Sequence, residues 1–311
     1  MGKAVALIAG PTASGKSDLA VELALELERR GSRGVVINAD SAQVYRDLRV
    51  LSARPSEEEM QGVEHRLFGT WDASEACSAA DWAARAKREI ENAQLSGAVP
   101  ILVGGTGLYI RILLDGIAPV PEIDPAVRET VRIMSTPAAY AELEAVDPQR
   151  AAALNHGDKT RIARALEVVR STGKPLSYWQ ERRAGGIAEA VTLFPLILLP
   201  ERAWLYQRCD ARFAQMVAKG AIEEVAALLA RGLSPSLPAM RAIGVPEIRA
   251  LLQGQLTRDE AIASGQQATR NYAKRQYTWF RRQPPASWPV CNDLDPSAGV
   301  FEILFRHLLL T

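Results

Sequence analysis

The residues GPTASGKS carry the clearest chemical signal in this chain of 311 residues. Their types and spacing fit the phosphate-loop pattern G-x-x-x-x-G-K-[ST], in which backbone N–H groups surround a phosphate. The loop comprises Gly10, Pro11, Thr12, Ala13, Ser14, Gly15, Lys16 and Ser17. We expect Lys16 to reach the terminal phosphate and the Ser17 hydroxyl to ligate Mg²⁺. The pattern predicts a phosphorylated ligand; a glycine turn that merely precedes a helix is the alternative.

A second set of polar side chains, NADSAQVY, begins at Asn38. Asp40 follows a short apolar run, and a carboxylate beside a phosphate loop can act as a general base or assist Mg²⁺. The alternative is an aspartate that only caps the next helix. We therefore treat Asp40 as a candidate catalytic residue.

A third motif, GGTGLY, starts at Gly104 and places the Thr106 hydroxyl after two glycines. Glycines at a strand end allow the backbone to approach a ligand closely, although they also suit a packing turn. Phosphate-loop hydrolases usually end a strand near this point with an Mg²⁺-directing aspartate. Its absence here counts against nucleotide hydrolysis.

The stretch 261–292 contains no acidic residue. It carries the basic residues Arg270, Lys274, Arg275, Arg281 and Arg282, with Tyr272, Tyr277, Trp279 and Phe280 between them. Such a segment suits RNA phosphates and stacking on unpaired bases, or else a helix with a solvated basic face. Arg161 and Arg164 form a second basic pair, on one face of another predicted helix.

The remaining composition narrows the class of protein. The net charge is +1, and no apolar run reaches the roughly 18–20 residues of a membrane span. The N-terminus runs directly into a predicted strand, so we expect no signal peptide and a cytoplasmic protein. The lone His65 suggests a structural role, and the scattered histidines and cysteines suggest no metal site beyond Mg²⁺.

These residues need a framework that brings them together. Apolar runs at 5–10, 34–38, 98–105 and 193–199 read as buried strands, and a helix capped by Ser78 lies between two of them. The alternation predicts an α/β fold, a parallel sheet core with helices on both faces. Ligands bind such sheets at the carboxyl ends of the strands, where all three motifs fall.

The rhythm of strand and helix stops in the middle of the chain. We expect a first core part at 1–120, an all-helical insertion at 121–189 and a second core part at 190–311. The last part reads as mostly helical, with a short strand near 286–292. The predicted architecture is a phosphate-loop NTPase-like core with a helical insertion domain.

Taken in order, the motifs resemble the tRNA dimethylallyltransferase (IPP transferase) family, in its bacterial form. They are GPTASGKS, DSAQVY, GGTGLY, the helix from Asp158 to Glu167 with TGKPLS after it, RAIG and AKRQYTWFRR. The resemblance spans residues 10–282. It implies a monomer that transfers a dimethylallyl group from dimethylallyl diphosphate to the adenosine 3′ of the anticodon in the tRNA stem-loop.

The resemblance also implies roles for individual residues. Asp40 is similar to the general base of the family, Thr106 to its active-site threonine, and the loop with Lys16 to its diphosphate site with Mg²⁺. Contacts with tRNA are implied for Asp40, Ser41, Ala42, Gln43, Thr106, Arg128, Thr160, Arg161, Ile162, Ala163, Arg164, Arg241, Ala242, Ile243, Gly244, Lys274, Arg275, Gln276, Tyr277, Thr278, Trp279, Phe280 and Arg281.

Three other functions share parts of this pattern. A phosphate-loop kinase for small molecules or nucleotides would leave the basic aromatic segment unexplained. An isopentenyltransferase for free adenine nucleotides would not need the arginines that face tRNA. An RNA-binding nucleotide switch would make no product.

Overall fold

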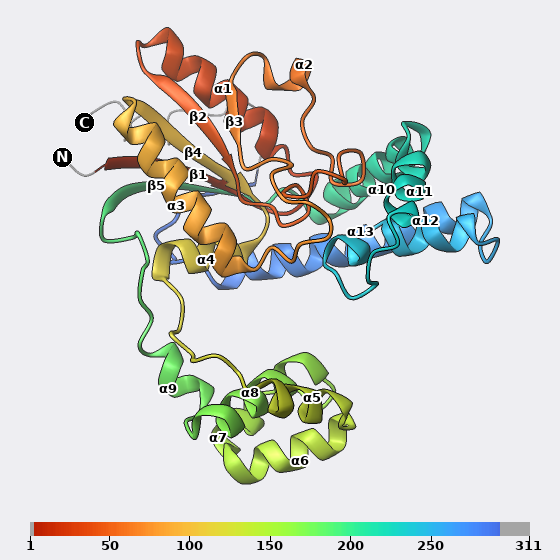
Figure 1. The fold of residues 1–311 in the computed structure, drawn as a ribbon. Coiled ribbons are helices and arrows are strands. Elements are labelled where there is room, and N and C mark those ends of the chain that lie inside the picture. The colour runs from red at the N-terminus through yellow and green to blue at the C-terminus, as the bar shows by residue number, and fades with distance from the viewer. Residues whose placement is uncertain (1–2, 293–311) are drawn as a thin grey trace. The chain divides into compact units, whose positions relative to one another are not determined.

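The computed structural model describes residues 3–292 and divides into two units (Figure 1). The sheet unit holds the chain up to Leu113 and again from Ile187, and the helical unit is Leu114–Gly186. The insertion therefore starts and ends at these residues rather than at 121 and 189. Residues 293–311 of the predicted third part lie outside the described residues.

Six strands form one parallel sheet in the described part of the sheet unit, in the order β3-β2-β4-β1-β5-β6. They are β1 (Lys3–Ala9), β2 (Arg33–Asn38), β3 (Glu64–Arg66), β4 (Ala98–Gly104), β5 (Val191–Leu198) and β6 (Val290–Cys291). The parallel α/β core is as predicted. Because parallel strands share one carboxyl edge, β1, β2 and β4 deliver their following loops to the same place.

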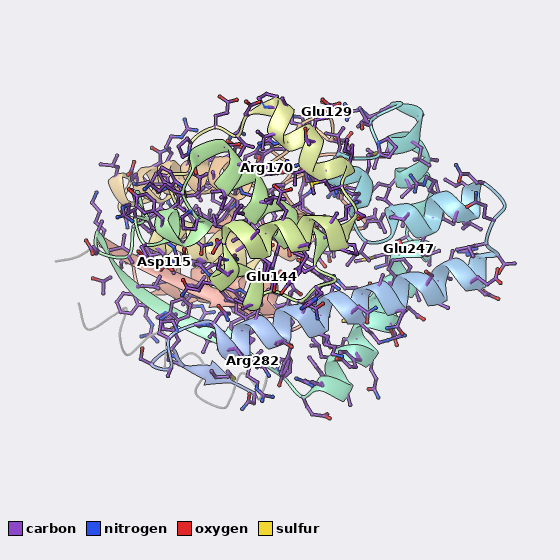
Figure 2. The ribbon with its side chains drawn as sticks, turned by 90° about the horizontal axis from the view of Figure 1, so that it is seen from below. Asp115, Glu129, Glu144, Arg170, Glu247 and Arg282 are labelled. Carbon is purple, nitrogen blue, oxygen red and sulfur yellow. The ribbon has the colours of Figure 1, made fainter. Side chains whose placement is uncertain are left out.

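Helices cover the sheet and continue past it. They are α1 (Lys16–Arg29), α2 (Glu57–Met60), α3 (Ala79–Leu95), α4 (Gly107–Asp115), α10 (Arg202–Ala218), α11 (Ala221–Ala230), η1 (Ala239–Arg241), α12 (Val245–Leu252) and α13 (Arg258–Arg282). Ser78 caps α3 in a capping box with Asp81, as its sequence predicts. The long helix α13 ends at Arg282, the residue labelled in Figure 2.

The core of the sheet unit follows the alternation of side chains along each strand. On one face Ile8, Val36 and Ile101 pack against Leu23 and its neighbours on α1. Residues of the other face, such as Leu7, are equally buried. Figure 1 shows α1 and α3 on opposite sides of the sheet.

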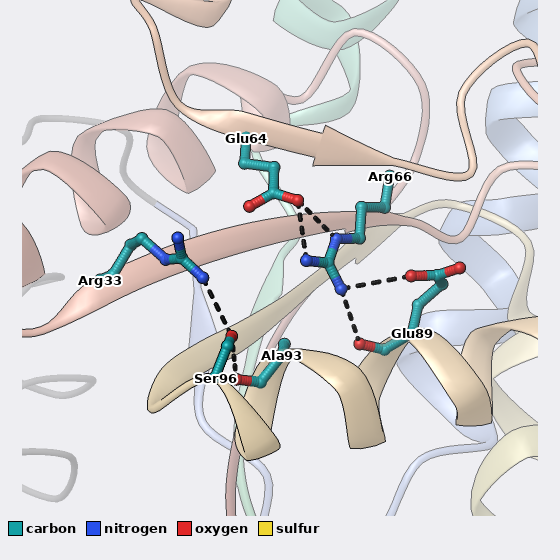
Figure 3. A network of polar contacts seen from close by, with 6 residues as sticks. All are labelled: Arg33, Glu64, Arg66, Glu89, Ala93 and Ser96. Atoms are coloured by element: carbon teal, nitrogen blue, oxygen red, sulfur yellow. Dashed lines mark hydrogen bonds and ion pairs between the residues drawn. The ribbon is translucent and has the colours of Figure 1, made fainter.

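Charged side chains protect the edge of the sheet at β3 (Figure 3). Arg66 pairs with Glu64 on its own strand, at 2.7 Å, and with Glu89 on α3, at 3.2 Å. Next to Glu64, His65 has Nδ1 2.8 Å from the Val63 carbonyl oxygen, and burial lowers the pKa of its ring. These contacts give His65 a structural role, as the sequence suggests.

The helical unit contains α5 (Pro125–Ile133), α6 (Thr136–Val146), α7 (Pro148–Ala152), α8 (Lys159–Thr172) and α9 (Leu176–Gln180). Its core includes Leu143, Ile162 and Leu166. Glu129 and Glu144 project from its helices into solvent (Figure 2). The buried Glu167 carboxylate lies 3.2 Å from Arg132 and 3.9 Å from Arg164, so it fixes two exposed guanidinium groups.

No helix among residues 3–292 is both long enough and apolar enough to cross a membrane.

Candidate active site

The phosphate loop connects β1 to α1 and depends on its glycines. Gly10 and Gly15 have φ of +156° and +85°, which favour glycine. A Cβ atom on Gly10 would also lie 2.4 Å from the Leu198 carbonyl oxygen of β5. The strand, loop and helix therefore have the arrangement that phosphate binding at a helix N-terminus requires.

Two later helices hold this loop from outside. The Gln276 side chain of α13 accepts a hydrogen bond from Thr12 N at 2.8 Å and donates one to Gly105 O at 2.9 Å. Arg208 of α10 donates to Ala13 O at 3.0 Å. Gln276 therefore ties the phosphate loop to the loop that follows β4.

The cations of the site lie against the same loop. Lys16 Nζ donates to Pro11 O at 2.6 Å, and burial lowers the pKa of Lys16 to about 8, partly offset by Asp40. Arg212 of α10 is also near Asp40; burial lowers the pKa of its guanidinium, whereas the Asp40 charge raises it. Two desolvated cations beside one carboxylate favour an anionic ligand.

Asp40 stands at the end of β2 in a turn that its own side chain stabilises. The buried Asn38 accepts from Asp40 N at 2.8 Å, and Asp40 Oδ1 accepts from Ala42 N at 2.9 Å. The next helix, α2, begins only at Glu57. Asp40 therefore does not cap a helix.

Three hydroxyl groups meet next to Asp40. Thr106 Oγ1 accepts from Ser41 N at 3.0 Å and donates to Ser41 Oγ at 3.2 Å. The Tyr272 hydroxyl bonds to the same two side chains; burial, followed by the Asp40 charge, raises its pKa. Thr106, Ser41 and Tyr272 therefore form a polar wall joining β2, β4 and α13.

Gly104 and Gly105 both pack closely against neighbouring segments, and Gly104 also lines a small cavity over the phosphate loop. A Cβ atom on Gly104 would lie 2.2 Å from the Ala39 backbone, and one on Gly105 would lie 2.3 Å from Gln276 Nε2. The close packing expected of a glycine turn is present at both positions, Gly104 also keeps a place beside the cavity, and Thr106 takes part in the polar wall.

Two cavities meet at Asp40. A polar one of about 40 Å³ lies over the phosphate loop, and its lining includes Lys16, Ser17, Gln43 and Arg212. A larger one of about 330 Å³ is mostly apolar, with Leu48, Leu51, Phe213, Met216 and Ile243 in its walls. Asp40, Thr12, Ser52 and Arg212 line both. The small cavity can hold a charged group and the larger cavity an apolar or planar group, with the Asp40 carboxylate between them.

The small cavity also fits Mg²⁺. The Ser17 hydroxyl and the Asp40 carboxylate both line it, and Mg²⁺ prefers oxygen ligands completed by phosphate and water. Among residues 3–292 no group of three or more His, Cys, Asp or Glu side chains could hold a metal ion. Any Mg²⁺ here would therefore need ligands from the bound phosphates.

Most residues expected to face tRNA are exposed or partly exposed. They include Arg128, Thr160, Arg161, Ala163 and Arg164 in the helical unit, and Arg241, Ala242, Ile243, Lys274, Arg275, Tyr277, Thr278, Trp279 and Arg281 in the sheet unit. Arg241 and Arg275 reach the larger cavity itself. Arg161 lies 3.5 Å from Asp158, the residue that caps its own helix.

Four residues expected to contact tRNA are buried: Ile162, Gly244, Gln276 and Phe280. Ile162 packs in the core of the helical unit, and Phe280 is 2% exposed. Gln276 uses its side chain on Thr12 and Gly105. On α8 and α13 only the outward face can meet RNA, so a continuous run of contacts along either helix is wrong.

Arg212, Tyr272 and Arg208 are the side chains of the site that the sequence did not reveal as part of it. Tyr272 was visible as an aromatic residue in the basic segment. Arg212 and Arg208 lie in the ordinary helix α10, where no local motif marks them. Only the packing of α10 against the phosphate loop brings them to the site.

Comparisons with known proteins agree with this geometry. A family model described as IPP transferase matches residues 43–283. The tRNA dimethylallyltransferase of Erythrobacter litoralis is 64% identical over 304 residues, which cover 97% of this chain and 96% of that protein.

Two solved structures are similar to the whole fold. The full-length tRNA isopentenylpyrophosphate transferase of Bacillus halodurans has a TM-score of 0.70 and 34% identity, covering 98% of this chain and 95% of that chain. A eukaryotic dimethylallyltransferase acting on tRNA has a TM-score of 0.76 and 28% identity, and the match covers 89% of this chain and 70% of that chain.

Proposed function

The chain belongs to the IPP transferase family, and from that membership we propose the reaction that it catalyses. It transfers a dimethylallyl group from dimethylallyl diphosphate to the exocyclic amine of the adenosine 3′ of a tRNA anticodon. The products are isopentenyladenosine in tRNA and diphosphate. The observation that carries the proposal is the position of Asp40, where the cationic cavity over the phosphate loop meets the larger apolar cavity.

The leaving diphosphate belongs in the small cavity. The bond between its oxygen and the allylic carbon breaks, and the electron pair leaves with the diphosphate. Lys16, Ser17 and Arg212 line this cavity, where the charge develops. Donors fixed before the reaction are effective because they need no reorganisation as the charge forms.

The adenine amine approaches from the larger cavity. Its lone pair is delocalised into the ring, so it is a weak nucleophile that must be held in line with the allylic carbon. The new bond joins the amine nitrogen to that carbon, and one amine proton passes to the Asp40 carboxylate. Because Asp40 Oδ1 already accepts from Ala42 N, we assign the proton to Oδ2.

The polar wall and the apolar walls complete the site. Ser41 and Tyr272 line the larger cavity and offer hydroxyl groups to the amine, and Thr106 is hydrogen-bonded to both of them. Phe213, Met216 and Ile243 exclude water from the dimethylallyl group. If Mg²⁺ is bound, the Ser17 hydroxyl would hold it together with oxygens of the diphosphate, and it would add positive charge at the leaving group.

The target base must leave the anticodon-loop stack to enter the cavity. Arg241 and Arg275 are exposed and also line the larger cavity, which supports their role in guiding the RNA backbone to its mouth. The proposal also includes a monomer that acts in the cytoplasm.

One experiment separates the proposal from its alternatives. The protein is incubated with Mg²⁺ and dimethylallyl diphosphate labelled in the dimethylallyl group, and tRNA, AMP and ATP are offered in turn. We expect label in tRNA alone. Label in AMP or ATP would identify an isopentenyltransferase for free nucleotides. A parallel reaction contains ATP labelled in its γ-phosphate. If no acceptor receives the dimethylallyl group and this ATP loses its γ-phosphate, the protein is a kinase or a nucleotide switch.

A further inference from the structure

We propose that Glu224 of α11 is a positioning residue for Gln43, acting through the segment Arg49–Ala53. The inference rests on the proposed function and on the tRNA contact that the family resemblance implies for Gln43, whose side chain lines the small cavity beside Asp40. Glu224 lies outside both cavities, so any influence on the reaction must pass through this segment.

The Glu224 carboxylate binds three successive backbone N–H groups. Oε2 accepts from Arg49 N and Val50 N, both at 2.7 Å, and Oε1 accepts from Leu51 N at 2.9 Å. Hydrogen bonds to an ionised acceptor are stronger than neutral ones, and a run of N–H groups facing one anion makes a tight cradle. One side chain of a distant helix therefore fixes the path of three residues.

The next two residues of the segment hold Gln43. Its Nε2 donates to Ser52 O at 3.1 Å and to Ala53 O at 3.0 Å. Gln43 lines the small cavity, Ala53 lines the larger one, and Ser52 lines both. The residues whose carbonyl groups orient the Gln43 amide therefore follow directly in the chain after the residues whose N–H groups bind Glu224.

The residue after α11 adds a second attachment to the same loop. Arg231 pairs with Asp47 and, at 2.6 Å, with Asp72. Asp47 in turn accepts from Ala73 N at 3.0 Å. The loop after Asp40 is therefore fastened at both Asp47 and Arg49–Leu51, and the Glu224 contact is the one adjacent to the carbonyls that hold Gln43.

Glu224→Gln replaces one acceptor oxygen by an NH₂ group that faces backbone N–H donors. We expect kcat/KM for tRNA to fall about 10- to 100-fold, the effect of removing a charged hydrogen bond. KM for dimethylallyl diphosphate should change less than kcat/KM for tRNA. Gln43 and Ser52 line the diphosphate cavity, but its cations, Lys16 and Arg212, lie outside the segment that Glu224 holds. The matched control is Glu223→Gln, the exposed neighbour on α11, which should match wild type.

A double-mutant cycle tests the route through Gln43. If Glu224 acts by orienting that amide, Glu224→Gln should add little to the loss already caused by Gln43→Ala. Fully additive losses, or a Glu224→Gln enzyme no different from Glu223→Gln, would overturn the inference. Glu224→Asp keeps the charge on a shorter side chain, and it enters the same cycle if Glu224→Gln does not fold.

A measurement without substrate distinguishes this inference from the proposed function. Hydrogen exchange at the amides of Arg49, Val50 and Leu51 should be protected in the wild type and faster in Glu224→Gln. Unchanged exchange there would contradict the positioning role even if tRNA is labelled. Failure of the wild-type enzyme to label tRNA would instead contradict the proposed function.

Discussion

The two carboxylate oxygens of Asp40 have different roles: one stabilises the turn, and the other is proposed to accept the amine proton. Oδ1 holds the turn through Ala42 N, and the carboxylate as a whole lies near Lys16 and Arg212. Because the turn occupies Oδ1, Oδ2 is the oxygen that remains to accept a proton from the adenine amine. The same geometry makes its amide analogue a clean test.

Asp40→Asn should lower kcat about 10²- to 10⁴-fold, because the amide keeps the shape but cannot take the amine proton. Affinity for tRNA, measured by filter binding, should change little. The control is Asp18→Asn, an exposed residue in the first turn of α1. An Asp40→Asn enzyme with undiminished kcat would remove Asp40 from the mechanism.

Lys16 should make donor binding depend on pH. Burial lowers its pKa from 10.5 to about 8, so the free protein loses this proton as the pH rises through about 8. A bound diphosphate favours the charged form and raises that pKa. Binding of inorganic diphosphate should therefore be strongest below pH 8 and weaken about tenfold per pH unit above it.

Calorimetry from pH 7 to 10 measures this dependence, and Lys16→Met should bind weakly with a nearly flat profile. The free energy of unfolding of the free protein should instead rise as the pH increases above about 8. Because the folded state releases this proton at about 8 and the unfolded state at 10.5, the cost of burying the charge is relieved between those values. Diphosphate affinity independent of pH would show that Lys16 does not contact the ligand.

At the scale of elements, local patterns predicted the strands, the Ser78 cap and the phosphate loop. They also placed Asp40 and Thr106 near one another, because parallel strands share a carboxyl edge. The break between α10 and α11 was not predicted: Gly220 has φ of +105°, and a single glycine in an apolar helical pattern gives little warning. The pairing of β3 was missed because its three residues, around His65, gain their strand geometry from β2.

The same limit applies to the site. Arg212 and Gln276 belong to the site because α10 and α13 pack on the phosphate loop. This tertiary packing cannot be predicted from local sequence patterns. For Gln276 even the direction of the side chain differs from the expectation. Periodicity on α13 separates inner from outer faces, but it does not say that a buried glutamine binds a loop.

Gln276→Ala should loosen the phosphate loop by leaving Thr12 N and Gly105 O without their partner. Each buried group left unsatisfied costs about 1–3 kcal/mol, so KM for dimethylallyl diphosphate should rise about tenfold and Tm should fall. Gln267→Ala, at an exposed position of the same helix, is the control. Steady-state kinetics with varied donor give the answer; if both variants have the wild-type KM, the tie does not support the donor site.

At the scale of the whole molecule, both units carry exposed basic residues expected to meet RNA. Lys274, Arg275 and Arg281 lie on α13, and Arg128 and Arg164 lie on the helical unit. In the helical unit the buried Glu167 restrains Arg164, which reduces the side-chain entropy lost on binding. If both units bind one tRNA, each should contribute to the salt dependence of its affinity.

Replacing Arg128 and Arg164 by glutamine should reduce the slope of log K against log[salt] by about 0.7–0.9 for each phosphate that the variant no longer neutralises. Replacing Lys274 and Arg281 should do the same, and the combined variant should show the sum of the two reductions. Arg29→Gln, an exposed position on α1, is the control. A slope unchanged by the helical-unit variant would limit tRNA binding to the sheet unit.

The position of the helical insertion in the chain also sets the order in which the two units can fold during translation. Leu113 O accepts from Ile187 N at 3.0 Å, so the chain leaves the sheet unit and returns to it at one point. Strand β1 pairs along its whole length with β5, which follows the insertion in the chain. During synthesis β1 therefore emerges long before this neighbour, while the helical unit, with its local contacts, can fold at once. The β1–β5 pairing forms only after translation has passed the insertion.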